Sequence, residues 1–498
     1  MTEPCDMSAV DARKAISGRE LSPVELTRSC LKRIDELNPV LNAMVTVAAE
    51  SALDDARRAE DAIVGGNGGG LLHGLPVAIK DLQPTKGIVT TYGTSYYRDH
   101  IPDEDAGIVA RIREAGGIVI GKTNIPEMSI GANTINRLFG ATGNPYAPEL
   151  TCGGSSGGSA VAVATGMAPL ATGSDHGGSL RIPACFSGVV GHRATPGTVP
   201  HESRTIAQTN YSLQGPMARN VDDAALLLAA ISTRDRASRR DPMSFPLDRQ
   251  TFLDLVSPRI NQMKIGVTSD FGGLLVSSHV RREFESRVDY LKGAGAKVIE
   301  LSLDLTEAVE VDWQLRADIF ATQYHRDIAD FDESFNPNVF RTYETALSTT
   351  VLQIARARRK QVDLFCRLDA VFDDVDIVMC PGVSVPPFPW SSLHPTEIDG
   401  EKVDNYMSWL GLTSCLTVVG HPVAALPAGL DSTGLPFGIQ CIAPMYRDAA
   451  LLGMARTLEK TFTVSGHYAL PAPDREAIQQ ANPRCQELGK KAAVAAAR

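Results

Sequence analysis

The chain has 498 residues, of which 43% are hydrophobic and 21% are charged, and its formal net charge at pH 7 is −10. This composition is typical of a folded globular protein and excludes a disordered chain. The acidic net charge, without any cluster of Lys and Arg with interleaved aromatic residues, argues against a nucleic-acid-binding protein.

Cysteine usage and the apolar stretches indicate the cellular compartment. The nine cysteines are scattered, and none lies in a CxxC pair, which predicts reduced thiols in a cytoplasmic protein rather than disulfides or a zinc site. The first residues, MTEPCDMSAV, have neither the basic nor the apolar region of an export signal. Gly, Pro, Ser or His interrupts the most apolar stretches, so we expect no membrane span.

The first sixty or so residues are predicted to be helical. The clearest helix is SPVELTRSCLKRIDELNP, in which Ser22 is a good N-cap, Pro23 suits the first turn and Glu25 completes a capping box. Apolar residues recur every three or four positions along it, which predicts one buried face. The next stretch, GGNGGG (65–70), is predicted to be a flexible loop because it lacks the GxGxxG spacing and the strand of a dinucleotide site.

Strands and helices alternate after residue 74. LPVAIKD (75–81) and GIVIGKT (117–123) are predicted to be buried strands, with a helix between them over 106–115. Long helical patterns, such as 352–371, accompany the later predicted strands KIGVTS, AKVIELS, VDIVMCP and LPFGIQCIAP. This alternation predicts an α/β fold in which helices cover both faces of a sheet.

The domain organisation is predicted to be simple. No linker divides the sequence, so we expect one large domain over residues 1–498. Within it we assign N-terminal helices to 1–65, a catalytic core to 74–200 and a tail to 480–498. The alanine-rich end of that tail is expected to be helical or frayed.

Serines set among glycines are the most unusual feature of the sequence. TCGGSSGG occupies 151–158, and GSDHGGSLRIP, which brings a further glycine-flanked serine, occupies 173–183. Glycine at this density costs chain entropy, so it usually marks backbone geometry that other residues cannot adopt. The simplest interpretation is a structural turn that leads into a helix, with Ser155 or Ser156 as the cap.

Two known motifs fit this segment poorly. A phosphate-binding loop also presents backbone N–H groups, but the Gly-Lys-Ser/Thr ending of a P-loop is missing. Residues 153–157 match the GxSxG of an α/β-hydrolase elbow, yet the preceding NPYAPEL is a proline-rich turn instead of a strand. None of the ten histidines has a sequence context that marks it as a triad base, although a triad is assembled in space rather than in sequence.

Lys80 supplies a fourth interpretation. It ends the otherwise apolar strand GLPVAIKD, and lysine is rarely buried without a partner or a task. Taken alone, it is more simply a lysine that pairs with Asp81 or extends to solvent. Burial would lower its pKa from about 10.4 towards neutrality and make the amine a usable base. Together with the serines, such a base can deprotonate a nucleophilic serine through a bridging serine, while backbone N–H groups stabilise the oxyanion.

Six blocks of the sequence resemble the amidase signature family, in the order in which that family carries them. They run from about residue 74 to 445 and read GLPVAIKD, GKTNIPEM, FGATGNP, CGGSSGGSAVAVATGMAPLATGSDHGGSLRIPACFSGVVG, GPMARNVDDAALLL and GLPFGIQCIAP. The serine-glycine block is highly specific. The resemblance implies a single α/β/α domain with a central mixed β-sheet covered by helices, and a Ser–cis-Ser–Lys triad that requires neither a metal nor an organic cofactor.

The resemblance also assigns roles, residue by residue. Lys80 is the general base, Ser155 is the bridging serine after a cis peptide bond with Gly154, and Ser179 is the nucleophile. The oxyanion hole is formed by the backbone N–H groups of His176, Gly177, Gly178 and Ser179. Supporting roles are a hydrogen bond from Ser156 and an ion pair between Asp175 and Arg181.

Two positions depart from the family pattern. His176 stands where many relatives carry a smaller or aliphatic residue, and its implied role is through its backbone. His192 and Arg193 replace a common Lys-Pro pair, which counts against the amidotransferase branch of the family.

Two enzymatic functions follow from the resemblance. The first is a free-standing hydrolase of small amides, with carbamates (urethanes) and aryl esters as further substrates. The alternative is the amidase (A) subunit of a glutamine-dependent tRNA amidotransferase. A non-catalytic binding protein is disfavoured because all three triad positions are present. We expect a small-molecule substrate, no nucleic-acid or membrane partner, and a monomer or a homodimer.

Position along the chain suggests where the substrate binds. The expected pocket walls are Met128, Ser129, Ile130, Gly131 and Tyr211. The sequence shows no evident arginine that would clamp an acidic substrate, which favours neutral, apolar or aryl groups.

Overall fold

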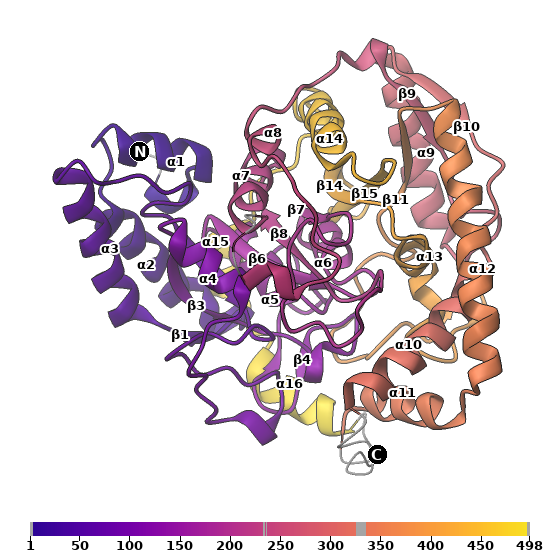
Figure 1. Cartoon of the computed structure of the whole chain (residues 1–498), viewed down its shortest axis with the longest axis horizontal. Helices are drawn as coiled ribbons and strands as arrows, with labels where there is room; N and C mark the ends of the chain where they lie inside the picture. Colours follow the sequence, from indigo (N-terminus) through magenta and orange to yellow (C-terminus); the bar gives the residue numbers. More distant parts are fainter. Residues whose placement is uncertain (1–2, 233–234, 236, 325–334, 496–498) are drawn as a thin grey trace.

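A mixed β-sheet of eleven strands runs through the molecule (Figure 1). The computed structural model of the chain describes residues 3–232, 235, 237–324 and 335–495. In spatial order the strands are β1 (Met44–Val47), β3 (Ile118–Thr123), β2 (Pro76–Lys80), β6 (Leu170–Asp175), β8 (Leu213–Ala218), β7 (Val190–Arg193), β14 (Val423–Leu430), β15 (Pro436–Ile442), β11 (Ile377–Pro381), β9 (Lys264–Val267) and β10 (Lys297–Glu300). Strands β3, β2 and β6 are parallel, as are β11, β9 and β10, and the other neighbours are antiparallel. The predicted α/β class is confirmed, and the mixed sheet is the one that the family resemblance implies.

The N-terminal helices lie at the β1 end of the sheet (Figure 1, indigo). They are α1 (Ala9–Ser17), α2 (Pro23–Leu41) and α3 (Ala49–Val64). Ser22 caps α2 as predicted, because its side chain accepts hydrogen bonds from the N–H groups of Val24 and Glu25. The prediction of helix throughout this region missed β1, which pairs with β3 and is only four residues long.

The strands that sequence patterns predicted are present as β2, β3, β9, β10, β11 and β15. The patterns missed β6, β7, β8 and β14, which lie in the middle of the sheet. Strand β6, for example, is buried at every position and ends in Gly-Ser-Asp. A strand buried on both faces shows no alternation of polar and apolar residues, and Gly and Asp are poor strand formers.

Helices pack along the sheet and against one another. The helices that contact the sheet are α4 (Gly107–Glu114), α5 (Gly157–Ala164), α6 (Arg181–Ser187), α7 (Val221–Ile231), α9 (Ser278–Gly293) and α14 (Asp448–Thr463). Helix α8 (Gln250–Leu253) contacts α7 and α14. At the end of the molecule opposite the N-terminal helices lie α10 (Ala308–Tyr324), α11 (Pro337–Ser348) and α12 (Val351–Asp369), and α13 (Gly411–Val419) contacts α10 and α12 (Figure 1). None of the described helices combines the length and the apolar character that crossing a membrane requires.

The last two described helices pack against the first third of the chain. Helix α15 (Arg475–Gln480) contacts α2, and α16 (Cys485–Ala495) packs on the short hairpin of β4 (Ile135–Asn136) and β5 (Gly140–Ala141). A Cβ atom at Gly489 would lie 2.3 Å from the backbone nitrogen of Ala141, so this helix lies directly on the hairpin. A second short hairpin joins β12 (Glu397–Ile398) to β13 (Glu401–Lys402). The described part of the predicted tail is therefore a packed helix.

Candidate active site

Lys80 ends β2 and is completely buried. Its Nζ donates to three hydroxyls, at 2.7 Å to Ser155 Oγ, 2.9 Å to Ser156 Oγ and 2.8 Å to Ser174 Oγ. Ser174 lies on the neighbouring strand β6, and sequence reasoning missed it because that strand carries no recognisable pattern. The structure thus brings together Lys80 and both serines of the predicted SS pair.

Burial lowers the pKa of Lys80 to about 7, while the carboxylate of Asp175 acts in the opposite direction. The physical cause is the loss of solvation, since an ammonium group is disfavoured in a medium of low polarity. Its three contacts are neutral hydroxyls, and in the described part of the chain no carboxylate forms an ion pair with this amine. Lys80 can therefore lose its proton near neutral pH, which is what a general base requires.

The turn before α5 places Ser155 and Ser156. The peptide bond between Gly154 and Ser155 is cis, as the resemblance implied. Ser156 occupies the N-cap position of α5, but its side chain makes no cap hydrogen bond and instead contacts Lys80. The interpretation of these serines as simple helix caps is therefore wrong. Gly158 is required by space, because a Cβ atom there would lie 2.4 Å from the backbone nitrogen of Asn124.

Ser179 lies in the turn between β6 and α6 and borders the same cavity as Ser155. Its carbonyl accepts a hydrogen bond from the Ser156 N–H at 3.2 Å, which ties the two serine-bearing turns together. Ser179 is half-buried, whereas Ser155 is only 1% exposed. No hydrogen bond joins the two hydroxyls in the described structure, so Ser179 is placed at the cavity but is not engaged by its predicted partner.

Asp175 is the buried anchor of this turn. Its carboxylate pairs with Arg181, with 2.9 Å between Nε and Oδ2 and 3.0 Å between Nη2 and Oδ1, and with Arg193 Nη1 at 3.2 Å. Burial alone would raise the pKa of Asp175, but these two guanidinium groups hold it well below its usual range. The ion pair between Asp175 and Arg181 is present, and Arg193 adds a second cation that sequence reasoning treated only as a departure from the family.

The backbone N–H groups of the turn differ in availability. Gly178 donates to Asp175 Oδ1 at 2.8 Å, so this N–H is used within the turn. The N–H groups of His176, Gly177 and Ser179 have no hydrogen-bond partner among the described residues. Gly178 has φ +127°, a region that side chains rarely adopt, which explains the need for glycine at this point. Three donors of the predicted oxyanion hole are thus free to bind a ligand.

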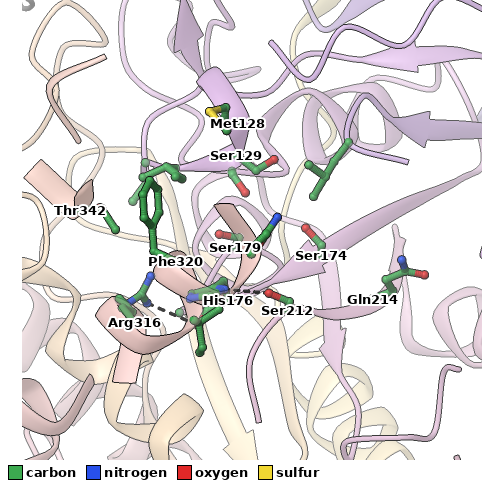
Figure 2. Close-up of a pocket in the computed structure, with 18 of the residues that line it drawn as sticks. Met128, Ser129, Ser174, His176, Ser179, Ser212, Gln214, Arg316, Phe320 and Thr342 are labelled. Atoms are coloured by element: carbon green, nitrogen blue, oxygen red, sulfur yellow. Dashed lines mark hydrogen bonds between the residues drawn. The ribbon is translucent and has the colours of Figure 1, made fainter. Parts of the chain in front are cut away.

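Both apolar and polar side chains border the cavity around Ser179 and His176. Figure 2 shows Met128 and Phe320 on one side, and Ser174, Ser212 and Gln214 on the other. Other residues that border the cavity are the apolar Ile130, Ile182, Ile319 and Leu410 and the polar Gln83, His201 and Ser203.

The expected pocket residues are only partly where sequence order suggested. Met128, Ser129, Ile130 and Gly131 border the cavity. Tyr211 does not: its ring is buried behind His176, with 4.9 Å between the ring centroids, and the next residue, Ser212, faces the cavity instead.

Arg316 is the charged residue that sequence reasoning missed. It comes from α10, borders the cavity and forms an ion pair with Asp312, with 2.8 Å between Nε and Oδ2. No sequence signal marks it, because α10 is remote from every family motif along the chain. Among the described residues that border the cavity, Arg316 is the only Arg, and none is Lys, Asp or Glu.

The His176 side chain is held in a neutral form. Burial, together with the cations Arg316 and Arg193, lowers its pKa well below the usual range. Its Nδ1 lies 2.9 Å from Ser212 Oγ, so the ring faces Ser212 at the border of the cavity (Figure 2).

One group of described residues has a metal-like arrangement, and it is not at the cavity. Glu3, Cys5 and Asp6 bring ligand atoms within 4.8 Å of one another. Arg33 forms ion pairs with both carboxylates, which accounts for the acidic pair without an ion.

This fold and site define a class of hydrolase, and comparisons with known proteins identify the family. The family model Amidase matches residues 25–452. The chain is 30% identical over 458 residues to an acylamidase of Rhodococcus erythropolis, covering 91% of this chain and 95% of the relative. It is 31% identical over 478 residues to a glutamyl-tRNA(Gln) amidotransferase subunit of a Cyanothece species, covering 90% and 97%. A bacterial aryl acylamidase of the amidase signature family superposes with a TM-score of 0.83 at 27% identity, covering 94% of this chain and 99% of that chain.

The chain belongs to the amidase signature family. It is a hydrolase that acts on carbon–nitrogen bonds of amides.

Proposed function

We propose that the protein is a free-standing amidase that hydrolyses small, neutral, apolar or aryl amides through Ser179, Ser155 and Lys80, by way of an acyl-enzyme. Carbamates and aryl esters are further proposed substrates, because the same nucleophile attacks each carbonyl. The observation that carries the proposal is the contact of 2.7 Å between a completely buried Lys80 and Ser155, beside a cavity that also exposes Ser179.

The mechanism begins with neutral Lys80. It accepts the Ser155 proton as Ser155 takes the proton of Ser179, and Ser179 Oγ attacks the substrate carbonyl. The tetrahedral oxyanion accepts hydrogen bonds from the free N–H groups of the 176–179 turn, and each essential donor is worth about 3–4 kcal/mol. The proton returns through Ser155 to the leaving nitrogen as the C–N bond breaks. Water then attacks the acyl-enzyme by the reverse proton path and releases the acid.

The composition of the cavity supports a neutral substrate. Apolar and aromatic side chains form one part of its wall, and an apolar or aryl group buries against them at about 25 cal/mol per Å². Arg316 does not supply a free positive charge, because Asp312 already pairs with it. We propose that the substrates are amides other than peptide bonds.

The alternative is the amidase subunit of a glutamine-dependent tRNA amidotransferase, and the similarity to the Cyanothece protein favours it. Glutamine carries an α-ammonium and an α-carboxylate, which call for a carboxylate and a free cation in the pocket. The described residues that border the cavity include no carboxylate, and their one arginine is paired. We therefore prefer the free-standing enzyme, a monomer or homodimer in the cytoplasm.

The test is a panel of an aryl amide, an aryl carbamate, an aryl ester and glutamine, assayed with the purified chain alone. Ser179→Ala should lower kcat by about 10⁴-fold or more, as expected for a missing nucleophile. Ser187→Ala is the matched control: this buried serine lies on α6, away from the cavity, and its hydroxyl has no partner among the described residues. Turnover of aryl substrates that survives only in the control supports the proposal. Glutamine turnover that appears only with added partner subunits would favour the alternative.

A further inference from the structure

Three consecutive carbonyls of the turn after β6 are each held by a side chain from elsewhere in the fold. The Asp175 carbonyl accepts from Arg193 Nη1 at 2.9 Å, and the His176 carbonyl accepts from Arg316 Nη2 at 3.4 Å. The Gly177 carbonyl accepts from Thr413 Oγ1 at 2.7 Å. These donors come from β7, α10 and α13, which converge on this turn.

Holding a carbonyl fixes the N–H group of the next residue. In a trans peptide unit the C=O and the following N–H point in opposite directions within one plane. Arg193 therefore orients the N–H of His176, and Arg316 orients the N–H of Gly177. Both N–H groups are unpaired among the described residues. The hydrogen bond to the preceding carbonyl sets the direction of each N–H, and the N–H itself is free to donate to a ligand.

Arg316 is seated against this turn by more than one contact. A Cβ atom at Gly177 would lie 1.8 Å from Arg316 Nη2, so the guanidinium fills the space that any other residue would need. Arg316 is 8% exposed, and the buried Asp312, one helical turn earlier on α10, holds its Nε. Figure 2 shows Arg316 reaching the His176 backbone from the side of the cavity that Phe320 borders.

We propose that Arg316 is a positioning residue for the amidase reaction: held by Asp312, it fixes the His176–Gly177 peptide so that the Gly177 N–H points at the oxyanion. The proposal rests on the proposed function of Ser179. It also links substrate binding to catalysis, because Ile319 and Phe320 of the same helix form part of the cavity wall. A substrate that presses on α10 thereby acts on the turn that stabilises the transition state.

Arg316→Lys tests the proposal, since lysine keeps the charge but loses the planar fork. We expect kcat for a neutral aryl amide to fall about 10–100-fold, because a misplaced oxyanion donor loses part of the 10²–10³-fold effect of removing it. KM should change by less than about threefold, because the interaction is used in the transition state rather than in substrate binding.

Arg287→Lys is the matched control. Arg287 is also buried, pairs with an acid one helical turn earlier, Glu283, and donates to a backbone carbonyl, that of Ala428, at 3.1 Å. It lies on α9 and does not border the cavity. Both variants keep the charge but lose the planar fork of a buried, acid-paired guanidinium, so an effect of general destabilisation appears in both, whereas loss of kcat is expected only in Arg316→Lys.

Two further measurements separate the outcomes. A carboxylate-bearing analogue of the aryl amide is assayed in parallel, and a rise in KM confined to that analogue would make Arg316 a substrate-binding residue and overturn the proposal. Amide hydrogen exchange over residues 173–180 should be faster in Arg316→Lys than in the control, and equal exchange would also overturn it. Turnover that persists in Ser179→Ala would contradict the proposed function, while the exchange comparison would still decide whether Arg316 holds the turn.

Discussion

Lys80 and Lys122 are two buried lysines on adjacent parallel strands with different surroundings. Both are 0% exposed, and the strand register sets Lys80 beside Thr123 and Ile79 beside Lys122. Burial lowers the pKa of both amines. Lys80 faces the hydroxyls of the serine cluster, whereas Lys122 donates to the Gln83 carbonyl, Thr85 Oγ1 and Thr90 Oγ1.

The difference shows that a lowered pKa does not by itself mark a catalytic base. Lys122 is electrostatically linked to Asp81, whose carboxylate favours the charged amine. The hydroxyls that Lys122 contacts belong to the loop after β2, so its amine serves to hold that loop in place. The carboxylate of Asp175 favours the charged form of Lys80 in the same way, but the contacts of Lys80 are the hydroxyls of the proposed catalytic cluster. Position decides which of two similar amines can act.

Replacing each lysine by methionine should affect catalysis very differently at the two positions. Lys80→Met should lower kcat/KM for an aryl amide by about 10²–10⁴-fold, the usual contribution of a general base. Lys122→Met should retain most of the activity of the wild type. Circular dichroism must show that both variants are folded, and equal losses in the two would remove the distinction between the lysines.

The pH dependence of catalysis should report the protonation of Lys80 and not that of Lys122. In the proposed mechanism the active form of Lys80 is the neutral amine, so kcat/KM should fall about tenfold for each pH unit below a midpoint near 7, the value to which burial lowers its pKa, and level off above it. The measurement is kcat/KM of the aryl amide from about pH 5 to about pH 9, which covers roughly two units on either side of that midpoint. Lys122→Met should leave the midpoint unchanged. A midpoint that moved in this variant would indicate that Lys122, and not Lys80, is the general base.

Ser174→Ala tests the contribution of a single hydroxyl to the environment of Lys80. It removes one of the three acceptors of Lys80 Nζ and should lower kcat/KM about 3–10-fold, the equivalent of one hydrogen bond. Because an acceptor stabilises the ammonium form, its loss should also move the midpoint to lower pH. A midpoint that moved upward would contradict the contact as described.

The smallest effect on catalysis is expected for Lys122, where the cost is to stability instead. Lys122→Met leaves polar partners such as Thr85 and Thr90 without a donor, and each unsatisfied buried group costs about 1–3 kcal/mol. Urea unfolding should therefore show a lower free energy of unfolding. Adding Asp81→Asn should recover part of the loss, because the double variant no longer leaves the Asp81 charge without Lys122; no recovery would mean that the two groups are not coupled.

Local patterns in the sequence were enough to predict the elements that depend on near neighbours in the chain. A lysine at the end of an apolar strand, paired serines among glycines and a capped helix at Ser22 each depend on neighbours within a few residues, and the structure has β2, the turn before α5 and the Ser22 cap of α2 in those places. Glycines such as Gly158 are fixed by backbone crowding. The family resemblance then added roles to these positions, and those roles remain predictions for Lys80, Ser155 and Ser179.

Contacts between remote elements decided what surrounds Lys80 and the serines. Ser174 meets Lys80 because β6 lies beside β2, and Arg316 and Thr413 reach the turn after β6 from helices that follow it by well over a hundred residues. No periodicity records such contacts, because they depend on the order of strands in a sheet and on how distant helices pack. For the same reason the side chain of Tyr211, which we expected in the pocket wall, is buried away from the cavity, and its neighbour Ser212 faces the cavity. Local sequence therefore predicted the candidate reactive groups, Lys80 and the serines among glycines. Which of these groups come into contact depends on the packing of elements far apart in the chain.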